Sequence, residues 1–168
     1  PILSSSFGLY TWMNNPESQM VAVTVRAGSK AEMALPDGTF VHLNAATNLE
    51  YDVNNSKQRL VKLSGEAFFD VAKNPDCPFK VIINDLQIEV VGTSFNVKTY
   101  KKDIVETSLL SGRIRISGGS LPHEYTLSPG QKATYSAMDR TLRISKADAH
   151  VEAGWRDNYL IFESTPLI

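Results

Sequence analysis

The stretch Arg59-Leu-Val-Lys-Leu-Ser-Gly-Glu-Ala-Phe-Phe-Asp-Val71 decides the fold class of this chain of 168 residues. From Val61 to Val71, every second residue is apolar or is glycine. Because successive side chains of a β-strand point to opposite faces, this period of two predicts strands that bury one face in a core. Glu66 and Asp70 fall on the outward parity, where a solvated edge is favoured over an acid–base pair.

The same period of two recurs along the chain from Met20 onward. The alternating apolar positions include Val21, Val23 and Val25; Val41 and Leu43; Val81 and Ile83; Ile88 and Val90; Ile114 and Ile116; Leu142 and Ile144. Clusters of Pro, Gly, Asn, Asp and Ser separate these runs, as turns do. The pattern predicts an all-β protein, a jelly-roll-like β-sandwich of two antiparallel sheets. Only the segment from about 148 to 155 is suited to a short helix.

A parity change around Gly92 predicts a corner. The core positions before Gly92 are even-numbered and those after Ser94 are odd-numbered, so the chain must bend or bulge between them, which glycine permits. A nucleophile elbow would need Gly-x-Ser-x-Gly between a strand and a helix. Asn96 stands at the second glycine position, so Ser94 is expected to be structural. Gly38, Gly65 and Gly92 recur at equal intervals, and we expect similar corners at all three.

The charge pattern argues against nucleic-acid binding. The formal net charge is −1, and nucleic-acid binders normally show a basic excess. Lys57, Arg59 and Lys62 form the densest basic group, which we interpret as a solvated strand face. No glycine-rich loop has the spacing of a phosphate-binding motif.

The sequence gives no indication of a metal site or of a thiol nucleophile. Cys77 is the single cysteine, so it forms no internal disulfide. His42, His123 and His150 lie on unrelated segments, whereas a cupin-type metalloenzyme needs clustered ligands. We therefore predict no catalytic residue, no metal site and no cofactor.

The N-terminal segment 1–19 has two interpretations. Residues 1–12 are moderately apolar but fewer than the roughly 20 that cross a bilayer as a helix. Tyr10 and Trp12 precede the polar residues 14–18, an order typical of the outer end of a membrane helix. A frayed tail fits the same composition.

Six blocks of sequence together resemble one family. They are Leu35–Ala45 (LPDGTFVHLNA), Arg59–Val71 (RLVKLSGEAFFDV), Pro78–Val81 (PFKV), Val91–Val97 (VGTSFNV), Leu127–Gln131 (LSPGQ), and Trp155 with Tyr159–Phe162 and Thr165–Leu167. In this order they resemble the FecR-type anti-sigma regulators, in the spelling of their Bacteroidetes branch. Each block alone is weak, but together they cover nearly the whole chain. His42 and Val91 depart from the usual pattern, and neither departure touches an expected function.

The resemblance implies a regulatory role without catalysis. Such regulators are single-pass inner-membrane proteins of Gram-negative bacteria. A cytoplasmic segment binds an extracytoplasmic-function sigma factor, and the periplasmic part receives a signal from the signalling domain of a TonB-dependent outer-membrane transducer. The resemblance favours a membrane-proximal segment and linker for 1–19, a periplasmic β-sandwich domain for 20–147, and a C-terminal segment, 148–168, leading into a small α/β module. The sigma-binding segment and most of the membrane helix are expected outside this chain.

The C-terminal segment carries the candidate partner-binding residues. Trp155, Tyr159, Leu160, Phe162 and Leu167 are large apolar residues near the expected module, and such residues anchor interfaces. Packing of Trp155, Leu160 and Phe162 into the domain's own core is the alternative, since Leu160 and Phe162 share the parity of a final strand. A free strand edge that pairs with a partner strand is a second route of binding.

A carbohydrate-binding module is the alternative function. Jelly rolls bind glycans on flat aromatic platforms, and Tyr51, Tyr100, Tyr125 and Tyr135 are the aromatic residues available for one. They would form a platform only if several of them share an exposed face.

Overall fold

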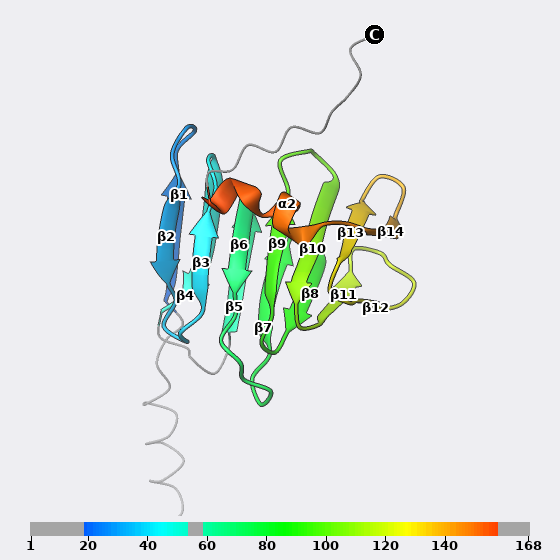
Figure 1. Cartoon of the computed structure of the whole chain (residues 1–168), viewed down its shortest axis with the longest axis horizontal. Coiled ribbons are helices and arrows are strands. Elements are labelled where there is room, and N and C mark those ends of the chain that lie inside the picture. Colours follow the sequence, from blue (N-terminus) through cyan, green and yellow to red (C-terminus); the bar gives the residue numbers. More distant parts are fainter. Residues whose placement is uncertain (1–18, 54–58, 158–168) are drawn as a thin grey trace, which may run out of the picture.

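Two seven-stranded sheets pack face to face in the computed structural model, which describes residues 19–53 and 59–157 (Figure 1). Sheet A has the order β1 (Met20–Val25), β4 (Thr47–Asp52), β5 (Arg59–Ser64), β7 (Phe79–Ile83), β8 (Leu86–Val90), β11 (Ile114–Gly118), β12 (Tyr125–Leu127). Sheet B has the order β14 (Thr141–Lys146), β13 (Gln131–Ser136), β10 (Ile104–Ser111), β9 (Ser94–Lys98), β6 (Glu66–Asp70), β3 (Phe40–Leu43), β2 (Ala31–Ala34). The predicted β-sandwich is confirmed, and its described strand pairs are antiparallel except β5 with β7, which is parallel.

The core lies between the inner faces of the two sheets. Phe69 and Phe95, on neighbouring strands of sheet B, stack with ring centroids 5.3 Å apart. Phe79 of sheet A meets Phe69 at 5.9 Å across the interior. All three side chains are at most 1% exposed. The alternation read from the sequence therefore does place one face of each central strand in a shared core.

The chain changes sheets at two of the three predicted glycine corners. Gly65 connects β5 of sheet A to β6 of sheet B, and Gly92 lies between β8 of sheet A and β9 of sheet B. A Cβ at Gly92 would lie 2.9 Å from the Cα of Lys73, so the backbones approach too closely for a side chain. The prediction is wrong for Gly38, which forms the turn of the β2–β3 hairpin within sheet B. Ser94 donates its hydroxyl to Asp70 Oδ1 at 2.8 Å, in keeping with a structural role.

Arg59 corrects the prediction of a solvated basic face. Its side chain is 1% exposed, because β5 turns it inward on the same parity as Val61. It donates from Nε to Asp37 Oδ2 at 2.7 Å and from Nη1 to the carbonyl of Cys77 at 2.9 Å. Lys62 alone fits the prediction among the described members of that group, with a side chain 58% exposed. Lys57 lies outside the described residues.

The chain ends its described course on the outer face of sheet B. The predicted short helix is confirmed as α2 (Ala149–Glu152), followed by the 3₁₀ turn η1 (Gly154–Asp157). Figure 1 shows this segment lying across the front of sheet B, and α2 packs against β9 and β10. We call Ala149–Asp157 the cap. Among the described residues no helix is long and apolar enough to cross a bilayer.

Candidate functional site: a polar seat beneath the C-terminal cap

A buried carboxyl group lies at the centre of the outer face of sheet B. Glu66 is only 5% exposed, which corrects the prediction of a solvated edge for this residue. Asn44 Nδ2 donates to Glu66 Oε2 at 2.8 Å, and Asn96 Nδ2 donates to Glu66 Oε1 at 2.9 Å. Each oxygen of the carboxyl group therefore has an amide donor, as buried polar atoms require. Asp70, on the same parity, is exposed as predicted.

Trp155 joins the cap to this carboxyl group through one side chain. Its indole Nε1 donates to Asn96 Oδ1 at 3.2 Å, while the amide nitrogen of Asn96 binds Glu66. A continuous series of hydrogen bonds thus runs from Trp155 through Asn96 and Glu66 to Asn44. In the described part of the chain, no buried side-chain nitrogen or oxygen lacks a partner.

The same series reaches the other sheet through the backbone of Glu66. The amide N–H of Glu66 donates to Thr47 Oγ1 at 3.0 Å, and Thr47 begins the adjoining strand β4 of sheet A. The amide N–H of Asn44 donates to the carbonyl of Glu66 at 2.9 Å. Glu66 is therefore hydrogen-bonded to the connection between β3 of sheet B and β4 of sheet A.

An aromatic row extends the covered area away from Trp155. The guanidinium of Arg156 lies over the ring of Phe68, 4.5 Å from its centroid. Phe68 meets His42 at 6.1 Å, and His42 meets Phe40 at 5.1 Å, both edge to face. Phe68 is 2% exposed but Phe40 is 40% exposed, so the row runs from beneath the cap into solvent. We call Asn44, Glu66, Phe68 and Asn96 the seat.

Two lysines hold the cap from opposite sides. Lys30 donates to the backbone carbonyl of Trp155. Lys132 on β13 lies 2.9 Å from Glu152 Oε1 and 3.3 Å from Glu106 Oε1. Partial burial lowers the pKa of Lys132, but the hydrogen bonds that it donates to Glu152 and Glu106, and the negative charges of these two residues, outweigh burial, so this pKa is raised. The ammonium is therefore charged at physiological pH, as both ion pairs require.

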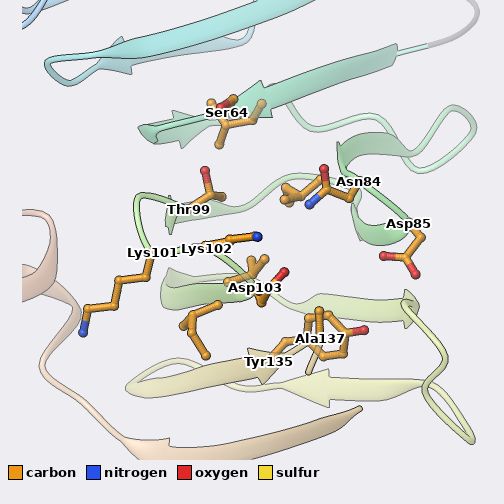
Figure 2. Close-up of a pocket in the computed structure, with 13 residues that line it drawn as sticks. Ser64, Asn84, Asp85, Thr99, Lys101, Lys102, Asp103, Tyr135 and Ala137 are labelled. Carbon is orange, nitrogen blue, oxygen red and sulfur yellow. The ribbon is translucent and has the colours of Figure 1, made fainter. Parts of the chain in front are cut away.

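A hollow lies at one end of the sandwich, where central strands of both sheets end. It has a volume of about 280 Å³, and its lining includes Asn84, Thr99 and Lys102. Figure 2 shows Lys102 extending across the hollow toward Asn84, while Lys101 points away. Its rim carries both lysines and aspartates, so no single charge dominates, and we assign no ligand to it.

Of the five predicted partner-binding residues, Trp155 is the one that lies among the described residues. Trp155 is half-buried and lies on the outer face of sheet B, so its side chain packs within the domain but outside the sandwich core. Tyr159, Leu160, Phe162 and Leu167 lie outside the described residues, and their assignment stays a prediction.

The four tyrosines of the alternative function do not share one exposed face. Tyr135 is 4% exposed and points into the core from sheet B, and Tyr51 and Tyr125 pack against the core from sheet A. Tyr100 donates its hydroxyl to the carbonyl of Ala45. Across residues 19–53 and 59–157, no cluster of His, Cys, Asp and Glu is placed to hold a metal ion.

The sequence analysis did not predict the seat, although the positions of its polar residues gave an indication of it. Asn44, Glu66 and Asn96 each stand beside apolar residues inside or next to a strand. Asn96 in particular lies between two core residues, Phe95 and Val97, at a position where a one-sided strand presents its side chain to water. An asparagine at this position can be buried if another segment covers it and binds its amide group. The folded structure shows that the cap is this segment.

Comparison with known proteins identifies the family of this chain. A family model described as FecR protein matches residues 21–115, which is more than half of the sequence. The chain belongs to the FecR family. The matched range contains all four seat residues and stops before the cap.

Solved structures carry the likeness over the rest of the domain. A crystal structure at 2.50 Å resolution of "a putative anti-sigma factor" from Parabacteroides distasonis has 31% sequence identity to this FecR chain and a TM-score of 0.79. The match covers 88% of this chain and 70% of that one. A second structure so named, from the same organism at 1.65 Å resolution, has 31% identity and a TM-score of 0.78, with 87% and 69% covered. No curated protein matches the chain. The FecR domain is therefore a domain of an anti-sigma regulator, a regulatory class of protein.

Proposed function

We propose that this FecR domain is the periplasmic sensor and transmission domain of an inner-membrane anti-sigma regulator. It relays a signal by protein–protein binding from the signalling domain of a TonB-dependent outer-membrane transducer. An extracytoplasmic-function sigma factor is the final recipient, bound by a separate cytoplasmic segment and not by the β-domain. The domain catalyses no reaction in this scheme.

One structural observation supports transmission above all others. The hydrogen-bonded series from Trp155 to Asn44 connects the C-terminal cap with the strand crossing at Thr47. A relay needs an element with two arrangements whose balance a partner changes. The cap has a suitable position, because it contacts sheet B directly and is connected to sheet A at Thr47 through Asn96 and Glu66.

The first test is a calorimetric titration of the FecR domain with the periplasmic signalling domain of the transducer encoded beside it. A parallel titration uses a chain extended past Ile168. Binding by both chains supports receptor contact on the β-domain itself. Binding by the extended chain alone places recognition beyond residue 168 and leaves the β-domain as a transmitter.

A non-cognate transducer domain serves as the control in both titrations. If neither chain binds the cognate domain, or if both bind the non-cognate domain equally well, the relay proposal is rejected. A glycan screen then becomes the next experiment, because the jelly-roll architecture is common to carbohydrate-binding modules.

A further inference from the structure

We infer that the seat is a partner-binding surface that the domain's own cap occupies in the resting state. A partner segment that presents an aromatic N–H donor followed by a cation replaces the cap and releases it. This inference deepens the relay proposal and rests on it for the class of partner, a signalling protein.

The cap has little stability of its own. Its helix α2 has four residues, far fewer than the roughly 12–15 that an isolated helix needs in water. Val151 of α2 is 37% exposed, whereas Ala153 is 3% exposed. The cap is therefore held by its contacts with sheet B and not by helix formation, so it opens when those contacts are replaced.

The surface beneath the cap tolerates exposure better than the core does. Asn96 is polar, so water replaces the indole N–H of Trp155 when the cap leaves, while Glu66 keeps its bonds to Asn44 and Asn96. Phe68 is the large apolar side chain of the seat, and it packs outside the main core cluster. Opening of the cap therefore exposes one aromatic ring and a hydrated carboxyl group, while Phe69 and Phe95 stay buried on the other face of the same strands.

The contacts of the cap specify the chemistry of its competitor. Asn96 Oδ1 accepts an indole N–H, and the ring of Phe68 receives a guanidinium. Lys132, further along sheet B, binds a carboxylate of α2. A competing segment therefore needs an acid about one helical turn before an aromatic donor, with an arginine or lysine directly after it. The exposed part of the row at Phe40 offers additional apolar contact beyond the cap.

Hydrogen exchange of the 168-residue chain tests whether the cap opens separately. We expect the cap amides to exchange faster than those of β6 and β9, since local opening bypasses global unfolding. Trp155→Phe keeps an aromatic ring, smaller than the indole, but loses the N–H donor, and it should raise cap exchange by about twofold to tenfold. Arg115→Gln on the outer face of sheet A is the matched control and should leave cap exchange unchanged. Exchange of cap and β9 in one common event, unaffected by Trp155→Phe, overturns the inference.

Binding in trans tests whether the seat accepts another segment. The probe is a synthetic peptide with the sequence of Ala147–Asp157, added to the Trp155→Ala chain whose own cap is weakened. We expect shifts of the Asn44 and Asn96 side-chain amide signals in NMR spectra, and binding at least about tenfold tighter than that of the same peptide carrying Trp155→Leu and Arg156→Gln. Equal binding of both peptides, or no shift with either, contradicts the inference.

The folding of each variant is checked by circular dichroism before these measurements. If Trp155→Ala does not fold, the peptide is added to the Trp155→Phe chain, which retains the ring. Neither experiment involves the transducer. A transducer domain that fails to bind therefore rejects the relay alone, while a seat that refuses the peptide rejects the exchangeable cap alone.

Discussion

Asn96 donates to Glu66 at 2.9 Å, although the register of β6 and β9 places Asn96 opposite Phe68 and Glu66 opposite Lys98. The amide therefore reaches diagonally along the outer face of sheet B, a distance that a side chain of this length spans. With its other end Asn96 accepts the indole N–H of Trp155. A single side chain thus fixes the position of the cap relative to the carboxyl group.

Removal of the carboxyl group at Glu66 should destabilise the domain strongly. Glu66→Leu deprives two buried amides of their acceptor, and we expect the free energy of unfolding to fall by about 2–4 kcal/mol. Glu66→Gln keeps one acceptor oxygen and should cost about half as much. Urea unfolding measures both, with Glu50→Leu on the outer face of sheet A as the control, where a change within about 0.5 kcal/mol is expected. A Glu66→Leu domain as stable as the wild type would show that the network contributes nothing.

Arg59 and Lys62 lie three residues apart on β5 but should differ widely in their effects. Arg59→Met breaks a buried pair with Asp37 and should cost about 3–5 kcal/mol. Lys62→Met removes an exposed pair with Glu50 at 3.9 Å and should cost less than about 1 kcal/mol. Denaturant midpoints of the two variants provide the comparison. Similar midpoints would contradict the burial of Arg59.

The corner at Gly65 should not accept a side chain. Its φ is +115°, and a Cβ there would lie 2.5 Å from Thr47 Oγ1 and 2.6 Å from Thr47 Cα. We expect Gly65→Ala to lower the free energy of unfolding by about 3 kcal/mol or more, since backbone strain and overlap add. Gly28→Ala, with φ of +78° and open space around it, carries the strain alone and should cost about 1 kcal/mol. Thermal unfolding of the pair separates the two contributions, and equal losses would refute the overlap.

The ion pairs of Lys132 should stabilise the domain throughout the neutral range. Its pKa is raised in the folded state, so its contribution is complete below the unfolded pKa of about 10.5 and is lost as the pH rises through the folded pKa. The difference in melting temperature between wild type and Lys132→Met should therefore stay constant from about pH 6 to 10 and shrink above that. A difference that already disappears near neutral pH would show that the pairs are open.

Two tyrosines should ionise late on alkaline titration. Burial raises the pKa of Tyr135, as does the charge of Asp85, while the charge of Arg140 opposes them. Burial also raises the pKa of Tyr100. Both groups favour the folded state below the unfolded pKa of about 10, and this stabilisation is lost as the pH rises through the folded values. Tyrosinate absorbance should show a late phase that Tyr100→Phe and Tyr135→Phe each reduce, and a late phase unchanged by both substitutions would contradict this.

The architecture could be predicted from the sequence because the alternation is regular within each strand and its parity is kept across the corner at Gly65. Between Val61 and Val71 the chain leaves sheet A at Gly65 and enters sheet B, yet the odd positions face the core on both sides of the glycine. Alternation alone thus reveals which residues are inward without revealing which sheet they belong to. Arg59 shares that inward parity, so its burial could have been predicted from the same pattern.

The seat could not be predicted from the same pattern. Glu66 and Phe68 fall on the outward parity, which an uncovered sheet exposes to water. Their burial depends on a segment more than 80 residues later in the chain, from Ala149 to Asp157, that crosses the outer face. The alternation within one strand does not show that a distant segment covers its outer face. Trp155 could be predicted as a partner-binding candidate only from its size and its position near the C-terminus.

The parallel pairing of β5 with β7 has a consequence for how the domain acquires its structure. The strand between them in sequence, β6, belongs to sheet B, so sheet B supplies the crossover that this parallel pair of sheet A requires. Neither sheet is a continuous stretch of chain, because strands of the two sheets alternate along the sequence. Topologies dominated by such distant pairings fold in roughly milliseconds to seconds. We therefore expect the two sheets to assemble together, before Ala149–Asp157 packs on the outer face of sheet B.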